Sequence, residues 1–460
     1  MSIADFSGRL RPDACPGALQ VHEAADGPLA RVRLPGGAIS SGRLRELAAC
    51  AADLGSGLIE LTSRANVQVR GLRSPAAFAE RIAAAGLLPS QAHERVRNIV
   101  ASPLGGRTGP GLLDPQPLVE ALDRALCSRP RLAELPGRFL FAVDEGSGDM
   151  LALEADVTFF DGRLLLAGVD AGFAVAADVA AERMIAAAEA FLDERPGGER
   201  GAWRIAELDH GPARIATRLR TSATPDRAGT PLDVTATPDR AGTPLDVTGA
   251  TDRAPGTSLH GSGTPDRATA TPPPRPTASR AGRVEQRDGR VALEVVVPLG
   301  RLSAAQARAI AEAAEVPEAA GPEGITGAAG PEGAAGPEGA AGPKSAAGED
   351  VSVRFTPWRT VVLLDLPPAA AGRAARTLEA AGLVTDPASP WAGVSACTGR
   401  PGCAKSLADV QEDARRWVAT LDGPPAAPVH WAGCERRCGL PRGRVVQMVA
   451  TGDGYQERHQ

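Results

Sequence analysis

Four of the seven cysteines gather near the C-terminal end of the chain in two pairs, and they are its clearest candidates for chemistry. Cys397 and Cys403 form a C-x5-C pair, and Cys434 and Cys438 form a C-x3-C pair. Four thiolates are the ligand set that an iron–sulfur cluster requires. Structural zinc sites more often have C-x2-4-C spacing at both ends, and disulfides are typical of secreted proteins. The spacing therefore favours a cluster, with zinc or unrelated cysteines as alternatives.

The residues around these cysteines predict two loops that converge on one point. Glycines lie within two residues of the cysteines, at Gly399, Gly402, Gly433 and Gly439. Residues 404–417 have helical spacing, so we expect Cys403 at the start of a helix, where backbone amides favour a negatively charged cluster. Residues 429–431 indicate a strand that ends just before Cys434.

The composition limits the class of protein. A chain of 460 residues allows two to four domains, and a hydrophobic content of 43% allows a sizeable core. The net charge of -5, without a basic block, argues against a nucleic-acid-binding protein. No apolar run is long enough to cross a bilayer, and the N-terminus lacks the pattern of a secretory signal. We expect a cytoplasmic protein without a membrane or nucleic-acid partner.

The first predicted unit spans residues 16–75 and combines strands with one covering helix. Its expected elements are a strand at 29–34, a helix at 42–54, and strands at 58–61 and 67–69. Ser40 or Ser41 is placed to cap the helix. Arginines on the exposed edges of this unit would present positive charge to an anion.

A second predicted unit spans residues 90–206 and is rich in strands. Its expected elements are helices at 112–126 and 177–192 and strands at 139–143, 151–157 and 164–169. Residues 207–281 then change in character, because ATPDRAGTPLDVT occurs twice in tandem at 223–235 and 236–248. The segment is poor in large apolar residues, so we expect a disordered linker.

From residue 282 the chain repeats the pattern of its first unit. Pro35 to Ser40 corresponds to Pro298 to Ser303, and Thr62 corresponds to Thr356. The repeated unit is expected to span 282–370 and to contain a solvated Gly-triplet loop at 317–350. The last unit, 388–455, carries the four cysteines. Such a duplication predicts pseudo-twofold symmetry with equivalent faces meeting at one site.

These residues together resemble the nitrite/sulfite reductase superfamily. The resemblance lies in LTSRANVQVRG, RNIVASPLGG, TPWR and the C-x5-C…C-x3-C pattern. It implies an α+β fold in which two ferredoxin-like half-domains alternate with two α/β domains that bind a [4Fe–4S] cluster and a tetrapyrrole. The cysteine pattern combined with T-x-R-x-x-x-Q (Thr62 to Gln68) is more specific than either part alone.

Within the superfamily the sequence is most similar to the precorrin-3B synthase branch. The segments that carry this likeness are CPGALQVHEAADGPLARVRLPGG, SPLGG, LPGRFLFAVDEG and ACTGRPGCAKSLADVQEDA. The resemblance implies a monooxygenase that hydroxylates precorrin-3A at C20 with γ-lactone formation, in aerobic cobalamin biosynthesis. A siroheme-dependent sulfite or nitrite reductase is the alternative enzyme, and a non-enzymatic metal module is the third reading.

An acidic macrocycle would need cationic partners, and arginine binds carboxylates through two hydrogen bonds. The candidate residues for tetrapyrrole carboxylates are Arg31, Arg33, Arg64, Gln68, Arg70, Arg97, Arg138 and Arg359. A solvated surface role is the alternative for each arginine, least so for Arg64 within its motif. Arg138 stands where reductases of the superfamily tend to place lysine.

The resemblance also implies partners and cofactors beyond the cluster. These are O2, a mononuclear non-haem iron, NADH-derived electrons delivered by a reductase or ferredoxin, and siroheme in the alternative reading. The sequence singles out no catalytic residue and no set of two His and one carboxylate for iron. His430, close before Cys434, is expected to be packed or to lie behind a ligand. Cys438 is assigned to the cluster only.

Overall fold

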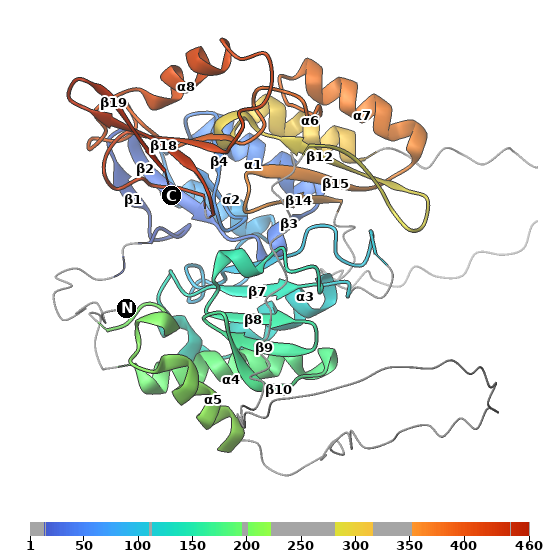
Figure 1. Ribbon diagram of the computed structural model, residues 1–460, viewed down its shortest axis with the longest axis vertical. Coiled ribbons are helices and arrows are strands. Elements are labelled where there is room, and N and C mark those ends of the chain that lie inside the picture. The colour runs from blue at the N-terminus through green and yellow to red at the C-terminus, as the bar shows by residue number, and fades with distance from the viewer. Residues whose placement is uncertain are drawn as a thin grey trace, which may run out of the picture.

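The computed structural model describes residues 13, 15–109, 113–195, 201–221, 281–315, 352–441 and 443–459. Their strands form four sheets. One sheet with its helices makes the lower part of the molecule in Figure 1, and the other three make the upper part. The tandem repeat at 223–248 and the Gly-triplet loop lie outside the described residues.

The first unit forms a sheet that borrows its last strand from the second half of the chain. Its order is β1 (His22–Ala24), β2 (Gly27–Val32), β5 (Val67–Val69), β4 (Leu58–Leu61) and β13 (Arg301–Ser303). Helices α1 (Ser41–Leu54) and α2 (Pro75–Ala84) belong to the same unit. The predicted helix and strands are confirmed here. Ser40 caps α1, since its side chain accepts a hydrogen bond from the Arg43 amide.

The repeated unit forms a second sheet that borrows a strand in return. Its order is β11 (Gly282–Glu285), β12 (Val291–Val296), β15 (Thr360–Leu366), β14 (Val353–Phe355) and β3 (Ala38–Ile39). Helices α6 (Ala304–Ala314) and α7 (Pro368–Ala380) accompany it. Each half therefore donates one short strand to the other, and buried residues of both halves form one hydrophobic core.

The predicted internal duplication is confirmed at the level of single turns. The short 3-10 helices Pro35–Gly37 and Pro298–Gly300 both contain a left-handed residue, Gly36 and Leu299. The hydroxyl oxygens of Thr62 and Thr356 each accept amide hydrogen bonds from the residues two and four positions later. Three residues after each threonine the backbone is again left-handed, with φ 55° at Ala65 and 61° at Arg359.

The lower sheet belongs to the first α/β domain. Its order is β10 (Val169–Ala174), β9 (Arg163–Leu166), β8 (Val157–Phe160), β7 (Phe141–Asp144) and β6 (Ile99–Ala101). The helices of this domain are α3 (Gln116–Cys127), α4 (Ala177–Glu194) and α5 (Gly211–Thr221), and its 3-10 turns are Pro130–Glu134, Leu151–Leu153 and Ile205–Glu207. The predicted strand at 151–157 is wrong, because a 3-10 turn comes first and β8 begins only at its last residue.

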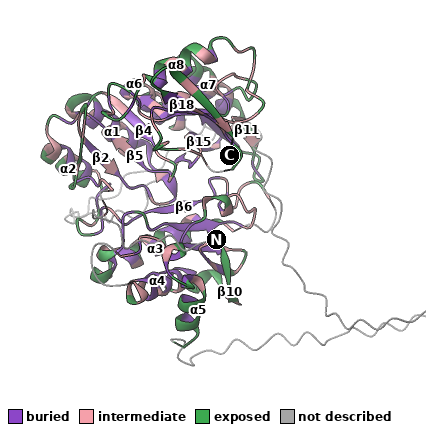
Figure 2. Cartoon of the chain, turned by 60° about the vertical axis from the view of Figure 1, so that its left-hand side comes forward, coloured by how far each residue is buried: buried purple, intermediate pink, exposed green. Residues whose placement is uncertain are grey.

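The predicted start of the linker at residue 207 is also wrong. Helix α5 lies inside the expected linker, and its buried residues Ile215, Ala216 and Leu219 pack into the core of the first α/β domain. The apolar face of this short helix is what keeps it folded, despite the polar composition that follows. Figure 2 shows the outer side of α5 and β10 exposed, with β6 buried.

The C-terminal domain repeats the strand pattern of the first α/β domain. Its order is β16 (Val394–Ala396), β17 (Val429–Ala432), β18 (Val446–Thr451) and β19 (Gly454–His459), with helix α8 (Val410–Val418). In both domains three parallel strands are followed by an antiparallel one. None of the helices in the described ranges combines the length and apolar composition needed to cross a membrane.

Candidate functional site

The four cysteines lie on loops at the carboxyl ends of two neighbouring parallel strands. Cys397 directly follows β16, and Cys434 follows β17 after one glycine. The carboxyl ends of adjacent parallel strands meet at one edge of a sheet, which is where such folds build ligand sites. The two loops are joined there, because Gly433 N donates to Cys397 Sγ at 3.2 Å and Leu407 N donates to Gly433 O at 2.8 Å.

The expected helix start at Cys403 is wrong. Helix α8 begins at Val410, where the side chain of Asp409 accepts a hydrogen bond from the Glu412 amide. The backbone around Cys403 forms a turn instead, in which Cys403 N donates to Gly399 O at 2.9 Å. Cys403 is therefore held by a turn, without the field of a helix N-terminus.

The four thiols are free and lie within electrostatic reach of one another. Burial raises the pKa of Cys397, and neighbouring Cys438 and Cys403 raise it further. Burial also raises the pKa of Cys438, and the neighbouring Cys434 and Cys403 raise this pKa further. No three His, Cys, Asp or Glu side chains in the described residues converge closely enough to hold a single ion. A cluster takes each thiolate on a separate iron atom, so this donor set fits a [4Fe–4S] group.

A cleft of about 220 Å³ connects two of these cysteines with the ferredoxin-like halves. Cys397 and Cys438 line it from the C-terminal domain. Four of the predicted ligand-binding residues also line it, namely Arg31, Arg64, Gln68 and Arg359. The sequence did not single out Glu60, Arg301 and Gln411, which line it too.

A buried carboxylate organises one wall of the cleft. Glu60 is 6% exposed and accepts hydrogen bonds from Arg301 Nε and Nη2 at 2.9 and 2.7 Å. It also accepts from Gln68 Nε2 at 2.6 Å, while Gln68 Oε1 accepts from Arg31 Nη2 at 3.0 Å. These contacts fix the orientation of the Gln68 amide and hold Arg31 beside it. Burial lowers the pKa of Arg31.

Arg64 and Arg359 bring further positive charge to the cleft. Arg64 Nη1 donates to Gly137 O at 3.1 Å, and burial together with nearby Arg204 lowers its pKa to about 10. Arg359 Nη2 donates to Gly439 O at 2.5 Å, and burial lowers its pKa to about 10 as well. Both guanidinium groups therefore remain charged at neutral pH.

The other predicted arginines do not line the cleft. Arg97 forms a bidentate pair with Asp123 at 2.7 and 2.6 Å. Arg33 is buried and donates to the main-chain oxygens of Pro16 and Arg95. Arg138 lies with its guanidinium 4.9 Å from the ring centre of Trp203. Arg70 pairs with Asp26 and donates to Gly402 O at 2.6 Å, so it contacts a cysteine loop instead of the cleft.

His430 is packed inside the C-terminal domain. It is fully buried on β17, and its Nδ1 hydrogen-bonds with Ser395 Oγ at 2.9 Å. Burial lowers the pKa of His430 to about 3, and the charge of Arg359 lowers it in the same direction. The ring is therefore neutral at physiological pH.

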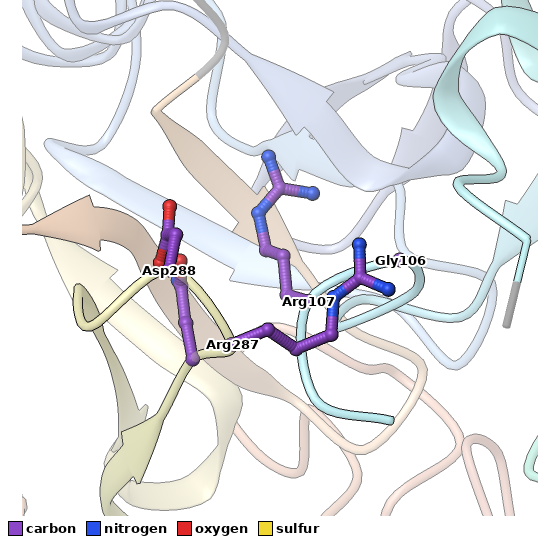
Figure 3. Close-up of a pocket in the computed structure, with 5 residues that line it drawn as sticks. Gly106, Arg107, Arg287 and Asp288 are labelled. Carbon is purple, nitrogen blue, oxygen red and sulfur yellow. The ribbon is translucent and has the colours of Figure 1, made fainter. Parts of the chain in front are cut away.

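The first α/β domain carries different chemistry at the equivalent strand ends. Ser102 directly follows β6, as Cys397 follows β16, and its hydroxyl donates to Asp149 Oδ1 at 2.6 Å. Nearby, Arg107 pairs with Asp365 at 3.0 and 2.9 Å, which ties this domain to the second ferredoxin-like half. A separate cavity of about 200 Å³ lies at this junction, and Figure 3 shows the side chains of Arg107 and Arg287 beside it.

Comparison with known proteins agrees with this architecture. Residues 22–77 match the nitrite/sulfite reductase ferredoxin-like half domain. A ferredoxin–nitrite reductase from Synechococcus elongatus is 33% identical over 27% of this chain and 26% of its own length. A precorrin-3B synthase from a Sinorhizobium species is 32% identical over 30% of this chain and 29% of its own length. The matched region thus spans less than a third of either relative.

The fold agrees over a much larger share of the chain. The solved NirA protein of Mycobacterium tuberculosis superposes with a TM-score of 0.63, covering 94% of this chain and 73% of its own, at 21% sequence identity. The predicted duplicated α+β fold is confirmed by this similarity and by the half-domain match. These similarities link the chain to nitrite and sulfite reductase proteins through one half domain in sequence and through most of its length in fold.

Proposed function

We propose that this protein is a tetrapyrrole-modifying oxidoreductase of the precorrin-3B synthase type, with a [4Fe–4S] cluster on Cys397, Cys403, Cys434 and Cys438. Its reaction would be the oxygen-dependent hydroxylation of precorrin-3A at C20 with γ-lactone formation. The observation that carries the proposal is the cleft in which two of the cysteines face Arg31, Arg64 and Arg359.

The charge of the cleft supports an acidic ligand. Precorrins carry many carboxylate arms, and a guanidinium group binds a carboxylate most strongly where water is excluded. Arg31 and Arg64 line the cleft from the first ferredoxin-like half, and the Gln68 amide links Arg31 to Glu60. These residues would bind and orient the macrocycle through its side arms, at the edge of the cysteine-bearing loops.

The cluster, when bound, would supply single electrons to this cleft. The similar nitrite reductase from Synechococcus elongatus carries ferredoxin in its name. We propose ferredoxin as the electron donor of this chain as well. The described residues offer no group of three metal-binding side chains for a mononuclear iron. We therefore assign no step to such an iron or to NADH.

A siroheme-dependent sulfite or nitrite reductase is the second candidate. Its support is that Cys438 lines the cleft, where a haem-type iron would approach the thiolate, and that the similar proteins include a nitrite reductase. The two candidates differ in what the purified protein contains, and in whether turnover needs O2.

The test is an anaerobic purification with iron, sulfide and zinc analysis and a visible spectrum, followed by turnover of precorrin-3A with and without O2. We expect about four irons and four sulfides per chain, no siroheme bands, and an O2-dependent product. Cys434→Ser is expected to lose the cluster, whereas Cys127→Ser, outside the site, keeps it. Bound siroheme with O2-independent turnover would favour the reductase, and zinc without sulfide would refute both enzymes.

A further inference from the structure

Arginines from the ferredoxin-like halves hold the cysteine-bearing loops by main-chain oxygens. Arg359 Nη2 donates at 2.5 Å to Gly439 O, the residue after Cys438. Arg70 Nη2 donates at 2.6 Å to Gly402 O, the residue before Cys403. Each loop is therefore fixed next to a cysteine by a cation from a different half of the duplicated scaffold.

The guanidinium of Arg359 fills the space beside Gly439, where an added Cβ atom would lie 2.4 Å from Arg359 Nη2. An added Cβ atom at Gly402 would first meet Thr398 Cγ2 at 2.8 Å and Asp26 Oδ2 at 2.9 Å, with Arg70 Nη2 at 3.3 Å. Gly439 also has a positive φ of 77°, which disfavours other residues. The Cys438 loop can approach Arg359 this closely because glycine stands at position 439.

The two arginines differ in how their charge is compensated. Arg70 is 7% exposed and forms a bidentate pair with Asp26, at 2.8 and 2.7 Å. In the described ranges, by contrast, no carboxylate lies within ion-pair distance of Arg359. The guanidinium of Arg359 thus brings a full positive charge to the cleft wall that contains Cys397 and Cys438.

We infer that Arg359 is a positioning residue that fixes the Cys438 loop and raises the reduction potential of the cluster. The inference rests on the cluster in the proposed function. Reduction adds a negative charge to the cluster, and a fixed cation nearby stabilises the reduced form. Arg70 holds the Cys403 loop in the same way but as half of a neutral pair.

The test is a redox titration of the cluster-loaded full chain, followed by electron paramagnetic resonance, with iron and sulfide measured on the same samples. Arg359→Gln is expected to shift the midpoint potential to more negative values, and Arg359→Lys, which keeps the charge, to shift it by less than half as much. Arg107→Gln is the matched control, because Arg107 ties the equivalent loop of the first α/β domain to Asp365. That control is expected to leave the potential unchanged.

A second variant keeps the inference testable if Arg359→Gln takes up no cluster. Arg70→Gln combined with Asp26→Asn removes a neutral pair, so we expect lower iron content with an unchanged potential in the molecules that load. An unchanged potential in a loaded Arg359→Gln, or an equal shift in Arg107→Gln, would overturn the inference and leave the proposed function standing. Failure of precorrin-3A turnover with the expected shifts would overturn the function alone.

Discussion

Gly37 lies where the first half of the chain crosses into the sheet of the second half, immediately before β3. Its φ is +69°, and a Cβ atom there would lie 2.0 Å from Phe355 O and 3.2 Å from the Ala65 Cβ. A real Cβ atom essentially never comes within 3.0 Å of a heavy atom outside its own residue and the two neighbouring residues. Gly37→Ala must therefore separate β3 from β14, because the obstructing atom belongs to the backbone.

The size of the effect follows from two costs. An alanine in the left-handed region costs about 1 kcal/mol. Relieving a contact in a packed interior costs about 1–3 kcal/mol more, so Gly37→Ala should lose about 2–4 kcal/mol. Gly57 is the matched control, since its φ is +79° and an added Cβ would meet no atom within 4 Å. Gly57→Ala should then lose only about 1 kcal/mol.

The assay is urea unfolding of the full chain, followed by far-ultraviolet circular dichroism, with both variants measured beside the unchanged protein. We expect a clearly lower midpoint for Gly37→Ala than for Gly57→Ala at similar m-values. A difference between the two variants smaller than about 0.5 kcal/mol would refute the close contact of the halves at this crossing.

Three further predictions concern charges. Glu60→Gln should cost about 3 kcal/mol, because it removes the buried carboxylate that pairs with half-buried Arg301, and unfolding in urea should show a much smaller loss for exposed Glu435→Gln. Arg64→Gln should weaken binding of the octacarboxylate uroporphyrin III about tenfold in a fluorescence titration, since one charge-assisted hydrogen bond is lost. Burial alone would raise the pKa of Asp365, but Arg107 lowers that pKa overall. The ionised carboxylate therefore contributes its full share of the free energy of unfolding at neutral pH. That share is lost as the pH falls through the folded-state pKa of Asp365. Asp365→Asn should accordingly lose less stability than the unchanged protein between neutral pH and about pH 3 in urea midpoints.

Local sequence patterns were sufficient for most of the elements in the ferredoxin-like halves. The helix behind Ser40 and the strands at 58–61 and 67–69 have strong periodicity and clear boundaries, and the structure has them at nearly the same residues. The repeat of residues 35–40 at residues 298–303 also predicted that the second half folds like the first. The sequence pattern of one half could not reveal the exchange of β3 and β13. The partner of each strand depends on how the two halves pack against each other, with α1 against α6.

The candidate site was predictable only in part. The motif residues Arg31, Arg64, Gln68 and Arg359 do meet the cysteine loops in one cleft. Arg97 and Arg70 carry equally suggestive motifs, but Asp123 and Asp26 pair with them. Such pairs are separated by tens of residues in the chain, so no spacing rule identifies them. Arg301 lies opposite Glu60 only because β13 is exchanged into the first sheet, so the sequence pattern did not point to it.

The duplicated scaffold explains why two domains with the same strand pattern need not share one chemistry. Ala65 and Arg359 occupy the same left-handed position of the same threonine turn, one in each half. In the second half the side chain at this position reaches the loop of Cys438. The strand ends of the first α/β domain have a serine and an aspartate in hydrogen-bond contact where the C-terminal domain has thiols. The fold therefore supplies the geometry twice, and the residues at a few strand ends and turns decide which copy carries the thiols and the cation beside them.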